Sequence, residues 1–222
     1  MDFRCIECGF HIRSKKSLYV QYSPGNIRLM KCESCRAVAD EYIECEIMIL
    51  LIDLILHKPK AYRHLLYNKL DQQALFWKAG ISFLVLDAYR LLILSGREEG
   101  VSDMWISFPS LTYPKMLMNL IFGNIAFLVT VLLWTRSLLK DLNTFLRCEH
   151  ILLAIFLSSY FKIFLIAMMV WEFPLSVLLI IDLFVLSSNT VAFKVMTELP
   201  LDKCIMVCFS AHAIKFFVGW LI

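Results

Sequence analysis

The pattern of hydrophobic and polar positions divides the chain into a polar front and a strongly apolar remainder. From residue 76 onward, apolar runs alternate with short polar connections. Each run has about the 20 residues that an α-helix needs to cross a bilayer. The pattern predicts five membrane spans, over residues 76–94, 116–135, 151–170, 174–193 and 204–222. We therefore expect a mainly α fold, with a polytopic α-helical transmembrane bundle over residues 76–222.

The first predicted span is the least regular, because it contains Lys78, Asp87 and Arg90. Charged side chains are costly inside a bilayer, so a re-entrant or interfacial helix is an open alternative for residues 76–94.

Two C-x-x-C pairs dominate the polar front. Thiolates spaced in this way can close a tetrahedral Zn²⁺ site. Strand-like residues 17–22 and 27–31 lie between the pairs, around a Ser-Pro-Gly-Asn turn, and predict a β-hairpin. Gly9 follows the first pair, where it can supply a positive φ. The expected ligands are Cys5, Cys8, Cys32 and Cys35.

These features predict a zinc ribbon over residues 1–39. About 40 residues bury too little apolar area to fold unaided, so the Zn²⁺ is expected to be structural. Redox chemistry is the minor alternative, since no βαβ pattern surrounds the cysteines. The first residues lack the apolar stretch of a secretory signal, which favours a cytosolic ribbon.

Residues 40–75 form a second part of the front. The apolar run 47–56 is too short to span, so it predicts a buried or interface-lying helix that ends near Lys58, before Pro59. Residues 57–78 mix basic side chains with tyrosines and leucines, as in an amphipathic helix on anionic lipid headgroups. A solvated linker face is the alternative. Within positions 40–75 the basic side chains are those of Lys58, Lys60, Arg63 and Lys69.

Composition agrees with a membrane protein. The chain is 59% hydrophobic and 18% charged, with a mean hydropathy of +0.69, and so departs from soluble domains. A net charge of +3 gives no indication of a nucleic-acid partner. With the front inside, the inner regions (1–78, 136–150 and 194–203) hold 17 Lys and Arg and the outer regions hold 2. This asymmetry predicts a cytosolic front.

Several polar residues fall at one predicted depth inside the spans. Lys162, Asp182 and Lys215 each lie 12 residues from the inner end of a span, which is about 18 Å of helix. Asp87 and Asn124 lie 11 residues in, so the five form a predicted intramembrane polar layer. Asp182 and Lys162 are the expected ion pair, because they flank a short connection symmetrically. Such residues can serve function or only lock helices together.

Cys204, Cys208 and His212 recur every four residues along the last span. Close packing of small side chains at a helix interface is favoured over a second metal site.

One string of residues carries a family resemblance. The two cysteine pairs are followed by Ala-Asp-Glu-Tyr-Ile-Glu at 39–44 and by Lys-Pro-Lys-Ala-Tyr-Arg-His-Leu-Leu-Tyr-Asn at 58–68. This pattern, over about the first 70 residues, resembles the homology domain of the Arv family. The resemblance implies an endoplasmic-reticulum membrane protein of sterol and sphingolipid homeostasis, connected with the supply of lipid precursors for GPI anchors.

The resemblance and the spans together favour a nonenzymatic protein that binds and distributes lipids. The sequence contains no G-x-S-x-G, P-loop or H-E-x-x-H pattern, which argues against an enzyme. The expected partners are sterols and other membrane lipids, including anionic headgroups. An adaptor for lipid-synthesis enzymes, among them those of GPI-anchor assembly, is the alternative. A membrane lipid transferase is the third possibility.

Overall fold

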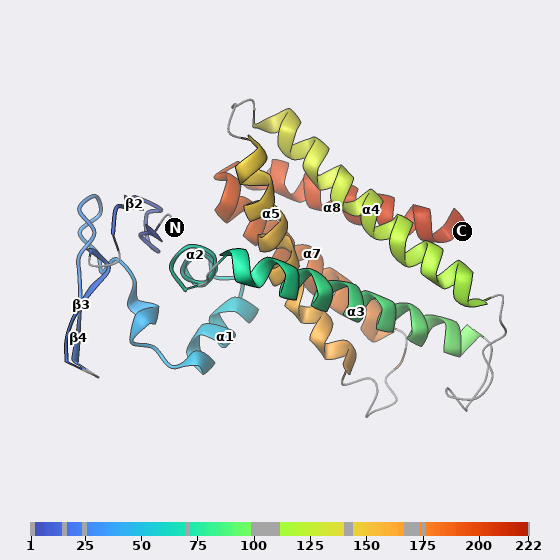
Figure 1. Cartoon of the computed structure of the whole chain (residues 1–222), viewed down its shortest axis with the longest axis horizontal. Coiled ribbons are helices and arrows are strands. Elements are labelled where there is room, and N and C mark those ends of the chain that lie inside the picture. Colours follow the sequence, from blue (N-terminus) through green and yellow to red (C-terminus); the bar gives the residue numbers. More distant parts are fainter. Residues whose placement is uncertain are drawn as a thin grey trace. The chain divides into compact units, whose positions relative to one another are not determined.

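The computed structural model describes residues 3–14, 17–23, 26–69, 72–98, 112–139, 144–166, 174 and 176–221. The chain divides into two units, residues 1–75 and residues 76–222 (Figure 1). The predicted fold class is confirmed: a helical bundle with spans follows a small N-terminal part that contains a β-hairpin and a cysteine cluster.

Unit 1 begins with two small antiparallel sheets. Strand β1 (Phe3–Arg4) pairs with β2 (His11–Ile12), and β3 (Tyr19–Ser23) pairs with β4 (Asn26–Leu29). The second sheet is the predicted hairpin, with Tyr19 opposite Leu29. The first sheet was not predicted, because strands of two residues carry no readable alternation.

Short helices complete unit 1. They are the 3₁₀ turn η2 (Glu41–Ile43), α1 (Ile47–Ile55), α2 (Pro59–Arg63) and the π-helical stretch η3 (His64–Lys69). Helix α1 ends before Pro59, as predicted. The predicted surface segment, residues 57–78, is corrected at Tyr62 and Tyr67, which α2 and η3 bury within unit 1. Contact of the segment with lipid headgroups stays a prediction.

A buried carboxylate joins distant parts of unit 1. Asp40 has no exposed surface, and its Oδ2 accepts hydrogen bonds from His64 Nδ1 and Asn68 Nδ2, both at 2.7 Å. Asn68 also bonds both backbone groups of Arg4, its Nδ2 donating to the carbonyl at 2.8 Å and its Oδ1 accepting from the amide at 2.9 Å. Asn68 therefore connects β1 to η3 and to Asp40.

Unit 2 consists of long helices. They are α3 (Gln72–Glu98), α4 (Thr112–Leu138), α5 (Thr144–Ser158) continued by the 3₁₀ stretch η4 (Ser159–Ile163), α7 (Ser176–Thr197) and α8 (Leu201–Leu221). Among the described residues, four helical segments are long and apolar enough to cross a membrane: Pro114–Leu138, Cys148–Ile166, Ser176–Thr197 and Leu201–Leu221.

These four segments correspond to the last four predicted spans. Residues 167–170 and residue 222, where two predicted spans end, and most of the connection at 171–174 lie outside the described residues. Helix α3 runs without a break through the first predicted span, 76–94, but it is not among the four segments found in the described residues. A crossing by α3 stays a prediction.

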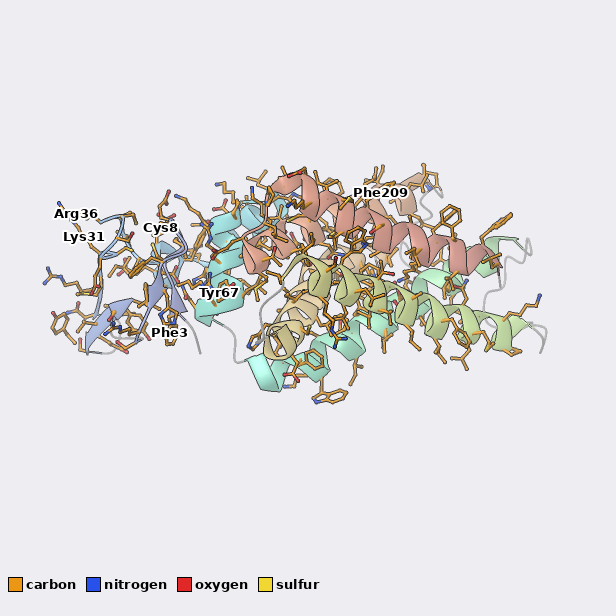
Figure 2. The ribbon with its side chains drawn as sticks, turned by 90° about the horizontal axis from the view of Figure 1, so that it is seen from above. Phe3, Cys8, Lys31, Arg36, Tyr67 and Phe209 are labelled. Atoms are coloured by element: carbon orange, nitrogen blue, oxygen red, sulfur yellow. The ribbon has the colours of Figure 1, made fainter. Side chains whose placement is uncertain are left out.

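The core of unit 2 is apolar and its outer surface is also apolar. Helix α4 packs along α8, and α7 packs against both α5 and α8. Phe83 of α3 joins this core through contacts with Phe127 and Phe156. Large side chains such as Phe209, labelled in Figure 2, are exposed on the outside. An apolar exterior of this kind is stable in lipid and not in water.

Removing the Asn68 side chain tests the polar connection in unit 1. We expect Asn68→Ala to destabilise this unit by about 2 kcal/mol, because Asp40 loses a donor and the two Arg4 backbone groups lose their partner. Hydrogen exchange of the amides in residues 3–14, measured on the full chain in detergent, should become faster. Gln21→Ala, at an exposed position of β3, is the matched control. Equal exchange in the two variants contradicts the prediction.

Candidate functional site

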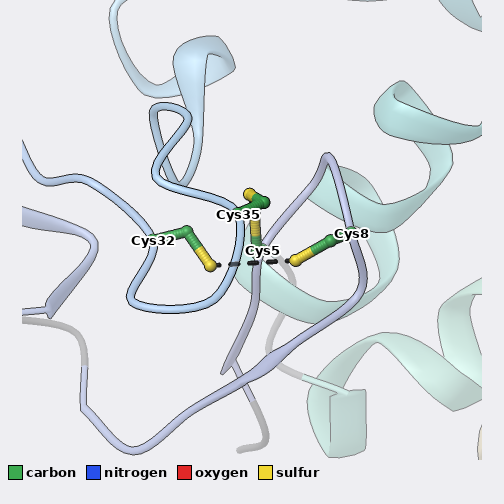
Figure 3. Close-up of side chains that lie close together, drawn as sticks. All are labelled: Cys5, Cys8, Cys32 and Cys35. Atoms are coloured by element: carbon green, nitrogen blue, oxygen red, sulfur yellow. Dashed lines mark hydrogen bonds between the residues drawn. The ribbon is translucent and has the colours of Figure 1, made fainter.

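The four cysteines of the two C-x-x-C pairs meet at one point. Their Sγ atoms all lie within 4.8 Å of one another. The Sγ atoms of Cys5 and Cys35 are 3.8 Å apart, and those of Cys8 and Cys32 are 3.7 Å apart (Figure 3). A tetrahedron with Zn–S bonds of about 2.3 Å has edges of about 3.8 Å, whereas a disulfide brings two sulfurs to about 2.05 Å. The spacing fits a four-thiolate metal site.

Both cysteine pairs turn the chain in the same way. The amide of Gly9 bonds the carbonyl of Cys5 at 2.9 Å, and the amide of Arg36 bonds that of Cys32 at 3.0 Å. Gly9 has a φ of 79°, as the sequence predicted, and Arg36 has a φ of 61° at the equivalent position. A non-glycine residue pays roughly 1–2 kcal/mol for this conformation. The second cysteine turn therefore has an unfavourable backbone conformation at Arg36, and closure of the four-cysteine site must offset this free energy.

The thiols differ in acidity before any metal binds. Burial raises the pKa of Cys5 to about 12. Burial also acts to raise the pKa of Cys32, but hydrogen bonds from the backbone amides of Cys35 and Ser34 outweigh it and lower that pKa to about 7. Because the thiolate is the form that ligates a metal, Cys32 is the ligand most nearly prepared for binding.

The predicted membrane-surface residues have partners inside unit 1. Arg63 Nη1 donates to the carbonyls of Ile6 and Glu7, at 2.8 and 2.9 Å, within the first cysteine turn. Lys60 forms a salt bridge with Glu7.

Lys58 bonds the carboxylate of Asp53 at 2.7 Å. Together with the Tyr42 hydroxyl, it holds the pKa of Asp53 below its usual value. Of the four predicted basic residues, three thus have partners within unit 1, and Lys69 is exposed. A role of these basic residues at a membrane surface stays a prediction.

The predicted polar layer in unit 2 is largely brought together. Asp87 of α3 bonds Lys162 of η4 at 2.6 Å through Oδ1, and bonds Lys215 of α8 through Oδ2. Lys215 also donates to Asn124 Oδ1 at 2.9 Å. The Lys162 ammonium lies 3.7 Å from the centre of the Phe83 ring, in cation–π contact. Asp87 and Lys162 are each only 4% exposed, so their charges must be compensated within the bundle.

The predicted pair of Asp182 with Lys162 is wrong. Asp182 bonds Arg90 Nη2 at 2.5 Å, while Lys162 bonds Asp87. Equal depth around a short connection does not decide which way each side chain points around its helix, and α3 supplies the nearer partner to both residues.

A neutral polar network was not predicted. The hydroxyl of Ser158 donates to Asn189 Oδ1 at 2.6 Å, and Asn189 Nδ2 donates to His212 Nε2 at 3.2 Å. Because the NH2 group of Asn189 can only donate, His212 Nε2 must accept this hydrogen bond and carries no proton. The polar residues Ser158 and Asn189 within apolar spans were the available signal in the sequence.

The remaining cysteines form no second cluster in the described part of the chain, where the N-terminal four are the only group of metal-ligating side chains found. Cys204 and Cys208 are buried in the core of unit 2, as expected for interface packing. His212 instead meets the ring of Phe127 edge-on.

Comparisons with known proteins agree over most of the chain. The sequence model of a family described as the Arv1-like family matches residues 4–193. Protein ARV 1 of Arabidopsis thaliana is 50% identical over 98% of this chain and 88% of its own length. Protein ARV1 of Homo sapiens is 32% identical over 87% of this chain and 72% of its own. No solved structure matches.

We expect one tightly held Zn²⁺ per chain. Cys32→Ser together with Cys35→Ser should abolish binding, because half of the ligands are lost. Elemental analysis of the purified full chain, with Ser34→Ala as control, checks this. Acid should release the metal, because protons compete for the thiolates. Full metal content in the double variant contradicts the assignment.

The charge cluster of Asp87, Lys162 and Lys215 leads to different expectations for the loss of its carboxylate and the loss of one lysine. Asp87→Asn leaves two lysines without a carboxylate, whereas Lys162→Met leaves the balanced pair of Asp87 and Lys215. We expect Asp87→Asn to lower stability by about 3 kcal/mol or more and Lys162→Met to cost much less. Thermal unfolding in detergent measures both, with Asp202→Asn at an exposed site as control. Equal losses in the two cluster variants contradict the assigned pairing.

Proposed function

We propose that this chain, which belongs to the Arv1-like family, is a multi-pass protein of the endoplasmic-reticulum membrane. Its proposed role is to mediate sterol and other lipid homeostasis by binding and distributing lipids. We propose further that it does so without covalent chemistry and that unit 1, with a structural Zn²⁺, lies on the cytosolic side. The excess of Lys and Arg in the regions on that side supports this orientation.

The observation that carries the lipid-binding proposal is a hollow on the outside of unit 2. It has a volume of about 360 Å³, lies between α4 and α8, and is open. Its lining is mainly apolar with two hydroxyl side chains, and consists of Thr130, Leu133, Trp134, Ser137 and Ile214. The volume falls at the lower end of the range for small-molecule sites.

A sterol has the matching chemistry. It presents a flat apolar body and a single hydroxyl, and the hollow combines an indole and aliphatic side chains with the hydroxyl of Ser137. Arg136 follows Thr135 near the end of α4, where a span approaches the headgroup region. A sterol hydroxyl seated there would remain near water while the ring system lies against α4 and α8.

An adaptor role is the second candidate, with lipid-synthesis enzymes, including those of GPI-anchor assembly, as partners. It is favoured by the separate cores of the two units, since unit 1 has its own buried cluster that includes Cys5, Leu18 and Ala39. A chain reduced to residues 76–222 separates the two roles. A lipid-binding protein should still be labelled by a photoreactive sterol, whereas an adaptor should lose its partners.

Filling the hollow tests the first proposal. We expect Ile214→Trp to reduce labelling by a photoreactive sterol several-fold in native membranes, because the larger side chain occupies the site. Peptide mapping should place the wild-type adducts on α4 and α8. Leu179→Trp, at a 66% exposed position of α7, is the matched control. Labelling spread evenly over all spans, or unchanged in Ile214→Trp, contradicts the proposal.

A further inference from the structure

Helix α1 of unit 1 exposes an unusual amount of apolar surface. Only Leu50 and Leu54 of this helix are buried apolar side chains. The other large apolar residues from 47 to 56 are between 41% and 65% exposed, and they are Ile47, Met48, Ile49, Leu51, Ile52, Ile55 and Leu56.

The exposed side chains form one continuous surface. At 100° per residue, these seven positions cover an arc of about 200° around the helix, and no polar side chain interrupts it. Asp53 lies outside this arc, where it accepts a hydrogen bond from the Tyr42 hydroxyl at 2.6 Å. A helix surface in water would carry polar residues over most of this arc.

The other described residues of unit 1 do not share this property. Its other exposed large apolar side chains, Phe10, Tyr22, Met30 and Val38, are scattered through the strands and turns. The closest parallel in the chain is the outside of unit 2, where Leu179 and Leu183 of α7 are 66% and 65% exposed. Those residues belong to a helix that is apolar enough to cross a membrane.

We propose that α1 lies in the plane of the bilayer surface, with its apolar arc embedded among the lipid acyl chains. The partner of this surface is the bilayer itself, and the inference goes beyond the proposed lipid-handling function, which assigns no role to α1. A ten-residue apolar run cannot span a membrane, but an in-plane helix can bury one face about 5–10 Å deep.

The short connection from unit 1 to unit 2 supports the bilayer as the partner of α1. Two residues of chain separate Lys69, the end of η3, from Gln72, the start of α3. Near that start, Trp77 is 74% exposed and is followed by the exposed Lys78, a pair of residue types that marks a membrane–water interface. The covalent link therefore keeps unit 1 within reach of the headgroups.

The charges near α1 indicate that the attachment is apolar rather than electrostatic. Lys58 and Lys60 are paired with carboxylates of unit 1, and Arg63 is bonded to backbone carbonyls. The residues just before α1 include Glu44 and Glu46. Contact through α1 should therefore require neither anionic lipid nor low salt.

Photo-crosslinking of the full chain tests the proposal. Benzoylphenylalanine is placed at Met48 or Ile52, and the protein is reconstituted in nanodiscs of neutral phosphatidylcholine. We expect lipid adducts, detected by intact mass, at a yield within about twofold of the yield at Leu179. Tyr22, which is 65% exposed in β3, should give at least fivefold less. Retention of one metal ion per chain confirms that each labelled variant is folded.

Every other outcome overturns the proposal. Crosslinks from position 52 to peptides of residues 76–222 would make α1 an internal contact, and crosslinked dimers would make it an interface between two copies. Adducts that appear only with 30% anionic lipid, or that fall more than threefold between 50 and 500 mM salt, would replace the apolar attachment by an electrostatic one. An equal low yield at positions 22, 48 and 52 would leave α1 in water.

Discussion

One carboxylate, that of Asp87, determines how the charged helices of unit 2 pack. It receives an ammonium group on each oxygen, Lys162 from η4 and Lys215 from α8. In a low-dielectric bundle each of these charges is costly alone, so α3, η4 and α8 are held in the one arrangement that brings the three together. The apolar contacts of Phe83 with Phe127 and Phe156 then follow, because they lie on the same side of α3 one turn earlier.

Unit 1 is closed by two independent connections between its first residues and its later ones. The cysteine cluster joins residues 5–8 to residues 32–35, and Asn68 joins Arg4 to η3 and to the buried Asp40. Arg63 adds a third contact at the carbonyls of the first cysteine turn. A small domain with little core thus gains order from polar and metal-ligating groups that are far apart in sequence.

The sequence predicted what depends on local spacing. The apolar runs located four helices with the properties of spans, and the two C-x-x-C pairs identified a thiol cluster that the structure brings within 4.8 Å. The partners of individual charges could not be predicted, because pairing depends on the rotation of each helix. Asp182 and Arg63 illustrate this, since their partners lie 92 and 57 residues away. Strands β1 and β2 were too short to leave a pattern.

The distance in sequence between Asp87 and its partners has a consequence for biosynthesis. Lys162 lies 75 residues after Asp87, and Lys215 lies 128 residues after it. A growing chain therefore releases α3 from the ribosome long before either ammonium group has been made. Asp87 can form its first ion pair once Lys162 has been made, and the complete cluster can form only once Lys215 of α8 has been made. The packing of α3 against η4 and α8 is therefore completed only after the last helix has been synthesised.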